Sequence, residues 1–145
     1  MKIFLICSKN FYGKIPVIKV ELEKIGHIIT LPNCYDDPTM EDKYREISNE
    51  AHSNWKAEML RHSTDVINEN DAVLVLNFEK NGIDNYIGGA TFLEMYDAFR
   101  LNKKIFIYND IPEGILQDEI IGFSPIILKS NLDKIRLRDS LRIIT

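Results

Sequence analysis

The residues with the clearest chemical potential lie in a polar, glycine-rich stretch that ends at a carboxylate. Gly88 and Gly89 stand side by side, and Glu94 follows shortly after them. Adjacent glycines allow the backbone to approach a ligand, and the free N–H groups at the start of a helix attract anions and polar atoms. A carboxylate in the first turn of that helix can face the same space. The spacing therefore predicts a binding site for a polar or anionic ligand beside Glu94.

The same residues have a purely structural interpretation. Thr91 and Glu94 have the spacing of a capping box, in which Thr91 begins the helix and the Glu94 carboxylate accepts a hydrogen bond from its backbone amide. Gly88 and Gly89 then form only the turn before the helix. The pattern leaves both interpretations open.

Several other kinds of site lack their sequence signatures. The first strand is not followed by G-x-G-x-x-G, the chain holds no P-loop lysine motif, and no serine lies in a nucleophile elbow. His27, His52 and His62 do not have the spacing of a zinc site, so we expect no metal. Since the dinucleotide and P-loop motifs are also missing, we expect no cofactor. We expect Cys7 and Cys34 to be free thiols.

The elements that must position these residues alternate along the chain. Apolar runs predict strands over residues 2–7, 27–31, 72–77, 105–108 and 126–128. Helical patterns cover residues 15–25, 41–61, 91–102, 115–121 and 131–142. This alternation predicts an α/β fold, a flavodoxin-like three-layer sandwich with a roughly five-stranded parallel sheet. Ligands bind such sheets at the carboxyl ends of the strands, which indicates the loops after Cys7, Asn77 and Tyr108.

Length and composition set the remaining expectations. The 145 residues, 45% of them hydrophobic, suit one globular domain over residues 1–145. The net charge of −4 and the scattered lysines and arginines argue against nucleic acid as a partner. No apolar run is long enough to span a membrane, and the first residues lack the pattern of a signal peptide, so we expect no membrane association and a cytoplasmic protein.

A family resemblance sharpens the hypothesis for Glu94. The strand Asp71-Ala-Val-Leu-Val-Leu-Asn77, the glycine-rich loop, Gly89-Ala-Thr-Phe-Leu-Glu94 with Ala98, and the strand entry Asn102-Lys-Lys-Ile-Phe-Ile resemble the nucleoside 2-deoxyribosyltransferase superfamily. That superfamily includes deoxyribosyltransferases and nucleotide N-glycosidases on a flavodoxin-like fold. The resemblance implies an enzyme, a transferase or a hydrolase, that cleaves or transfers the N-glycosidic bond of a nucleoside or nucleotide.

The resemblance also implies roles for individual residues. Glu94 matches the family's nucleophile, which attacks the anomeric carbon of the sugar, and Asp65 stands where an aspartate lines the base site and could assist proton transfer. Ser8 matches a position that holds sugar or phosphate oxygens, as Gly88 and Gly89 could. Solvated or turn positions are the alternatives for Asp65 and Ser8. Family members assemble as homo-oligomers, so a dimer or larger assembly is implied, with residues 109–122 as the exchanged segment.

Two positions depart from the family pattern. Transferases of the family often carry a sugar-binding aspartate where this chain has Gly88, and Asp84 or Asn85 could supply the missing polar group. The family's glycine after the nucleophile is Tyr96, which we expect to pack in the core with Phe92 and Phe99. The missing aspartate favours an alternative function, a non-catalytic nucleotide-binding or sensor module. A scaffold in which Glu94 is only a helix cap is the third hypothesis.

Overall fold

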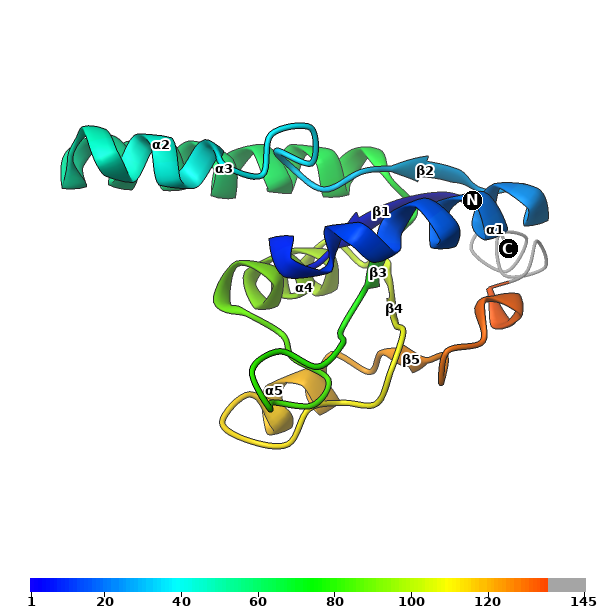
Figure 1. Cartoon of the computed structure of the whole chain (residues 1–145). Helices are drawn as coiled ribbons and strands as arrows, with labels where there is room; N and C mark the ends of the chain where they lie inside the picture. The colour runs from blue at the N-terminus through cyan, green and yellow to red at the C-terminus, as the bar shows by residue number, and fades with distance from the viewer. Residues whose placement is uncertain (136–145) are drawn as a thin grey trace.

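A five-stranded, all-parallel sheet forms the centre of the chain, with the strand order β2-β1-β3-β4-β5 (Figure 1). The computed structural model describes residues 1–135. The strands are β1 (Lys2–Ile6), β2 (Ile28–Thr30), β3 (Ala72–Val75), β4 (Lys104–Ile107) and β5 (Ile126–Ile127). This is the doubly wound order of flavodoxin-like folds, whose direction reverses between β1 and β3. The predicted fold class is confirmed.

Helices cover both faces of the sheet, which gives three layers. They are α1 (Ile15–Ile25), α2 (Met40–Ile47), α3 (Asn49–Glu69), α4 (Gly89–Arg100) and α5 (Gln117–Gly122), with the 3-10 helices η1 (Lys9–Lys14) and η2 (Leu132–Lys134). Ile3 and Leu5 of β1 pack with α1 and η2, whereas Phe4 and Ile6 pack with α3, α4 and α5. Successive side chains of a strand point to opposite faces, so these continuous apolar strands hold both outer layers.

The start and end of each crossover helix follow from local chemistry. Pro16 lies in the first turn of α1, where its missing N–H is not needed, and Gly26 ends the helix with a left-handed φ of 109°. Ser48 separates α2 from α3 because its backbone is extended. Its hydroxyl accepts a hydrogen bond from Ala51 N at 2.9 Å and caps α3.

Helices α2 and α3 form a long hairpin that extends along one side of the sheet (Figure 1). No residue of α2 is buried, whereas α3 buries Ser63 and Ile67 at its carboxyl-terminal half. The hairpin is anchored by that half of α3, which packs against α4 and the sheet. Its remaining length stands beside the carboxyl ends of β1 and β3.

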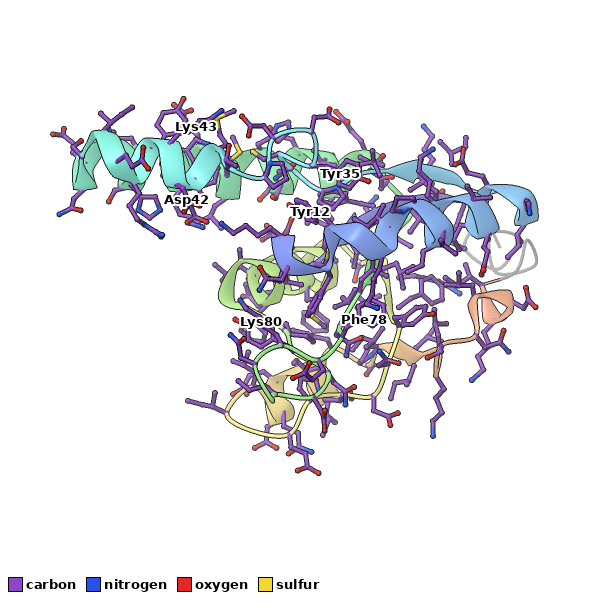
Figure 2. The ribbon with its side chains drawn as sticks, in the orientation of Figure 1. Tyr12, Tyr35, Asp42, Lys43, Phe78 and Lys80 are labelled. Atoms are coloured by element: carbon purple, nitrogen blue, oxygen red, sulfur yellow. The ribbon has the colours of Figure 1, made fainter. Side chains whose placement is uncertain are left out.

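An asparagine pair fastens the loops that follow β3 and β4. Asn77 is fully buried, and its amide nitrogen donates to Asp110 O at 2.9 Å while its side-chain oxygen accepts from Asn109 N. The Asn109 side chain returns a hydrogen bond to Asn77 O. In Figure 2, Phe78 lies beside this region, and its ring centroid is 5.1 Å from that of Tyr108. These contacts give the loop that leads to α4 a fixed starting point.

Several predicted element boundaries were wrong. The single helix expected over residues 41–61 is two helices, and the loop expected after β1 contains η1. Tyr96 and Phe99 do not pack in the core: both stay exposed on α4, where their rings contact Phe123. Of the helix expected over residues 131–142, only η2 is seen, and positions 136–145 lie outside the described residues.

Candidate functional site

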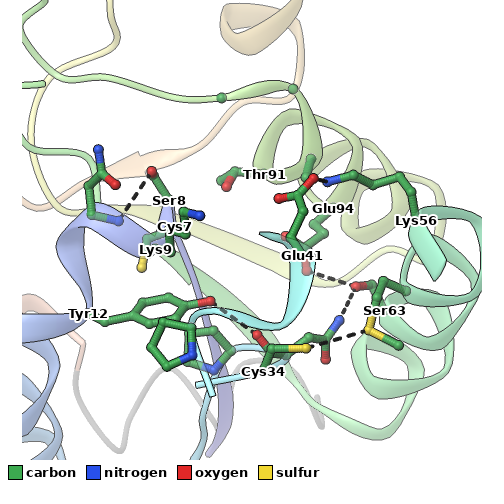
Figure 3. A pocket seen from close by; sticks show the side chains of 18 of the residues that line it. Cys7, Ser8, Lys9, Tyr12, Cys34, Glu41, Lys56, Ser63, Thr91 and Glu94 are labelled. Carbon is green, nitrogen blue, oxygen red and sulfur yellow. Dashed lines mark hydrogen bonds and ion pairs between the residues drawn. The ribbon is translucent and has the colours of Figure 1, made fainter. Parts of the chain in front are cut away.

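A pocket of about 320 Å³ opens at the carboxyl ends of β1 and β3, where the strand order reverses. Ligands bind doubly wound sheets at this place because the loops of neighbouring crossovers diverge there. The walls come from the loops after β1, β2 and β3, from the start of α4 and from the α2–α3 hairpin (Figure 3). The residues that line it include Cys7, Ser8, Lys9, Tyr12, Asn33, Glu41, Trp55, Lys56, Met59, Ser63, Lys80, Tyr86, Gly88, Gly89, Thr91 and Glu94.

The carboxylate of Glu94 faces this pocket from the second turn of α4. Its Oε2 accepts a hydrogen bond from the hydroxyl of Ser63 on α3 at 3.0 Å. Burial raises the pKa of Glu94 to about 7; the Ser63 hydrogen bond opposes the shift, and the charge of Asp97 adds to it. Both the charged and the protonated forms of Glu94 are therefore populated near neutral pH, and only the charged form can act as a nucleophile.

The start of α4 forms a second wall of the pocket. Gly88 is the N-cap residue, so no side chain caps the helix, and the first intrahelical hydrogen bond runs from Phe92 N to Gly88 O. The backbone N–H groups of the first three helix residues, Gly89 to Thr91, therefore have no acceptor within the helix. Thr91 is only 4% exposed, and its hydroxyl makes no hydrogen bond within residues 1–135. In Figure 3 its side chain lies between those of Ser8 and Glu94. This wall can donate several hydrogen bonds to an anion.

The segment after β1 brings a hydroxyl and a thiol to the pocket. Ser8 begins η1, and its Oγ accepts a hydrogen bond from Asn10 N at 3.4 Å. Burial, together with the charge of Glu94, raises the pKa of Cys7 to about 12, so its thiol stays protonated. Burial also raises the pKa of Tyr12, whose hydroxyl donates to Asn33 O at 3.1 Å. Neither group is an ionised nucleophile at neutral pH.

The hairpin contributes a charged and aromatic wall. Glu41 Oε2 lies 2.8 Å from Lys56 Nζ and 2.9 Å from His52 Nε2. Burial alone would favour protonated Glu41, but the hydrogen bonds from Lys56 and His52 outweigh it and lower the pKa of Glu41 to about 2. The indole of Trp55 makes stacked contacts with the rings of Tyr44, at 5.9 Å between centroids, and His52, at 6.3 Å. Together with Met59, this wall offers an apolar surface that suits a flat ring.

The structure brings together four of the seven residues proposed from the sequence. Ser8, Gly88, Gly89 and Glu94 all line the pocket. Asp65 is exposed on α3 and is not a lining residue, although Ser63, two positions earlier, contacts Glu94 directly. Asp84 and Asn85 belong to the loop before α4 but also do not line the pocket. The geometry thus supports no role for these three side chains in the pocket.

Sequence reasoning missed Asn33, Ser63 and Glu41. It indicated the loop after Tyr108, but the pocket is lined instead by the loop after β2 and by the hairpin. A usable signal existed for Ser63, because Trp55, Met59 and Ser63 recur at helical spacing on one face of α3. Asn33 follows β2 directly, so the rule for strand ends applied to it as well.

The capping interpretation of Glu94 is excluded. Helix α4 begins at Gly89 with Gly88 as its N-cap, so Thr91 is not the capping residue. The Glu94 carboxylate contacts Ser63 on a different helix. The crevice beside it is open, and the side chain points into it (Figure 3).

Residues 1–135 contain neither a metal-binding cluster nor a membrane-spanning helix. No three His, Cys, Asp or Glu side chains in this part of the chain are grouped to hold a metal ion. None of its helices is both long and apolar enough to cross a membrane. Comparison with protein-family models, with curated proteins and with solved structures gave no match.

Proposed function

We propose that this chain cleaves or transfers the N-glycosidic bond of a nucleotide, with Glu94 as the nucleophile. The observation that carries the proposal is one half-buried carboxylate, oriented by Ser63, in a pocket that also contains the open start of a helix. The resemblance of residues 71–107 to nucleoside 2-deoxyribosyltransferases supports the same reaction. The pocket volume of about 320 Å³ suits a small ligand.

The reaction follows the chemistry of retaining glycosyl transfer. A Glu94 oxygen forms a bond to the anomeric carbon while the bond from that carbon to the base breaks, and the electron pair leaves with the base. Water or a second base then attacks the anomeric carbon and restores the carboxylate. In hydrolysis, water supplies the hydroxyl group to the sugar and a proton to the departed base. The Ser63 hydrogen bond on Oε2 leaves Oε1 as the attacking oxygen.

Three features support a phosphorylated substrate over a nucleoside. The amides at the start of α4 and the buried Thr91 hydroxyl are hydrogen-bond donors without partners in the described part of the chain. Lys80 also lines the pocket; it lies over the Tyr86 ring at 4.6 Å and has no ion pair within residues 1–135. A helix start with an adjacent lysine is a favourable environment for phosphate. The base then reaches toward Trp55 and Met59.

Base release tests the proposal directly. The protein is incubated with a panel of nucleosides and nucleoside 5′-monophosphates, and free base is followed by chromatography. The assay is repeated with Glu94→Ala and Glu94→Gln. We expect release from monophosphates and its loss in both variants, because neither side chain can form the glycosyl bond. Release that survives in Glu94→Gln contradicts the assignment of the nucleophile.

A non-catalytic nucleotide sensor is the second candidate. It is favoured by Gly88, which provides no side chain for the sugar hydroxyl that the family's aspartate binds. In this case calorimetry detects nucleotide binding to the wild-type chain, and no base is released under any condition. Binding without release thus selects the sensor, and release selects the enzyme.

We propose, as the family resemblance implies, that two or more copies of this chain associate. Leu93, Tyr96 and Phe99 are exposed on α4, and Phe123 contacts the rings of Tyr96 and Phe99. A second copy that covers these side chains removes apolar surface from water. Light scattering at micromolar concentration tests this: a monomer contradicts it.

A further inference from the structure

We propose that Asn33 and Ser63 form a positioning relay that presents one fixed hydroxyl proton to Glu94 and so leaves a single carboxylate oxygen free to react. This inference rests on the proposed function in taking Glu94 as the reacting group. The relay joins three elements: Asn33 lies in the loop after β2, Ser63 on α3 and Glu94 on α4. Neither relay residue needs to touch the substrate.

The direction of the relay follows from counting protons. The hydroxyl of Ser63 has one hydrogen and can accept through its lone pairs. Asn33 Nδ2 lies 2.7 Å from Ser63 Oγ and donates to it. An ionised carboxylate accepts only, so the single Ser63 hydrogen points to Glu94 Oε2 at 3.0 Å. Asn33 thus prevents the hydroxyl from turning away.

Both relay residues are held in place by their surroundings. Ser63 is 4% exposed in the packed half of α3, so water competes little for its hydroxyl. Asn33 follows Pro32, and its own carbonyl accepts a hydrogen bond from the Tyr12 hydroxyl at 3.1 Å. A hydrogen bond to a carboxylate is stronger when both groups are preorganised and partly desolvated.

The other groups that face Glu94 show what the relay must oppose. Burial favours protonated Glu94, and Asp97, one turn along α4, adds to that effect, whereas Lys56 on α3 favours the anion. Cys7, directly after β1, and Tyr12 of η1 also interact electrostatically with Glu94. Ser63 is the one group that donates a hydrogen bond to this carboxylate in the described part of the chain. Its loss therefore shifts Glu94 further toward the protonated form.

Four variants separate the relay from simple packing. Ser63→Ala removes the donor, and Ser63→Thr keeps a hydroxyl at the same place. Asn33→Asp replaces the donating amide with an acceptor, which attracts the Ser63 hydrogen away from Glu94 while leaving the serine in place. Ser53→Ala is the matched control, because Ser53 is exposed on the same helix and does not line the pocket.

The experiment follows the Glu94 carboxyl directly by carbon-13 NMR titration and, in parallel, the pH dependence of kcat/KM for base release. We expect Ser63→Ala and Asn33→Asp to raise the Glu94 midpoint by about one pH unit or more. At pH 6 we expect them to lower kcat/KM by about tenfold or more, since each pH unit changes the ionised fraction by up to tenfold. Ser63→Thr restores most of the activity, and Ser53→Ala changes nothing.

Midpoints in Ser63→Ala and Asn33→Asp that match Ser53→Ala overturn the relay. The NMR titration needs no turnover, so it tests the relay even if no base is released from any substrate. Failure of the proposed function and failure of the relay are thus separate outcomes. If Ser63→Ala does not fold, Asn33→Leu decides the question by the same titration, because it removes the amide that donates to Ser63 without placing a new charge beside Glu94.

Discussion

Lys56 Nζ lies 2.8 Å from Glu41 Oε2, and this contact ties α2 to α3 at the edge of the pocket. Glu41 Oε2 also lies 2.9 Å from His52 Nε2, so one carboxylate oxygen meets an ammonium group and an imidazole ring of the neighbouring helix. Since α2 buries no residue of its own, this cluster is its main polar attachment. The arrangement also keeps Lys56 near Glu94, and the positive charge of Lys56 lowers the pKa of Glu94.

Loss of the Glu41 charge should loosen the hairpin. We expect Glu41→Gln to lower the free energy of unfolding by about 1 kcal/mol at pH 7. The effect is small because water screens the charges of these half-exposed groups. The folded-state pKa of Glu41, about 2, lies below its ordinary value of 4.5. The contribution of ionised Glu41 to the free energy of unfolding is therefore present above pH 4.5 and is lost as the pH falls toward 2. Denaturant titrations at pH 7 and pH 3 should show a smaller difference at pH 3.

Glu46→Gln is the control for this substitution, because Glu46 is exposed on the same helix and does not line the pocket. Equal effects of the two substitutions would show that the Glu41 cluster adds nothing beyond general surface charge.

Glu94 should reduce stability where it is ionised. Its folded-state pKa of about 7 lies above its ordinary value of 4.5. Because the folded state holds the Glu94 proton more tightly than the unfolded state, protonated Glu94 contributes fully to stability below pH 4.5. This contribution is lost as the pH rises through 7 and Glu94 ionises in the folded protein. At pH 8 we expect Glu94→Gln to raise the free energy of unfolding by on the order of 2 kcal/mol, since each pKa unit corresponds to about 1.4 kcal/mol. Thermal unfolding at pH 4.5 and pH 8 checks this, and a gain that is equal at both values contradicts it.

The sheet and its two covered faces could be predicted because that information is local. The runs around Phe4, Val73 and Phe106 are apolar at every position, a pattern typical of a parallel strand with helices on both sides. The loop with Gly88 and Glu94 could be identified for the same reason, because its glycines and carboxylate are close in sequence. Strand ends are harder to locate than strand centres, and this accounts for the small boundary errors.

The other half of the site depends on tertiary packing. Ser63 and Glu94 are far apart in sequence, and they meet only because α3 packs on α4. The break at Ser48 turns α2 back along α3 and brings Glu41 to the pocket, but serine is common inside helices as well as at their starts. Periodicity could not separate these two roles of serine. Asp65 was proposed from the family resemblance, whereas the contact between Ser63 and Glu94 exists only in the packed fold.

The buried hydroxyl of Thr91 should report on phosphate. If it binds a substrate phosphate, Thr91→Val removes one hydrogen bond to a charged group, and the Kd for a nucleoside 5′-monophosphate should rise by about tenfold or more. The Kd for the matching nucleoside should not change. Calorimetry with both ligands measures this, and Thr91→Ser, which keeps the hydroxyl, should retain tight binding. A parallel loss for nucleoside and monophosphate would place the Thr91 contact elsewhere on the ligand.

Gly88 can be tested by substitution, and its neighbour Gly89 supplies the matched control. A Cβ at position 88 would lie 3.3 Å from the hydroxyl oxygen of Tyr86, whereas one at position 89 would meet no atom within 4 Å. The backbone at Gly88 has a φ of −82°, which alanine adopts without strain. The tyrosine hydroxyl is the far end of a side chain that can move, so we expect Gly88→Ala to change the free energy of unfolding by no more than about 0.5 kcal/mol.

The consequence should appear in binding instead. Tyr86 lies under Lys80, so a displaced ring shifts the lysine at the mouth of the pocket. We expect Gly88→Ala to weaken monophosphate binding by about threefold to tenfold, an effect of order 1 kcal/mol, while Gly89→Ala stabilises the fold slightly and leaves binding within twofold of wild type. Calorimetry and thermal unfolding on both variants measure this difference. Equal binding in the two variants would show that the position of Tyr86 does not matter for the ligand, because the contact with Tyr86 is what distinguishes the two glycines.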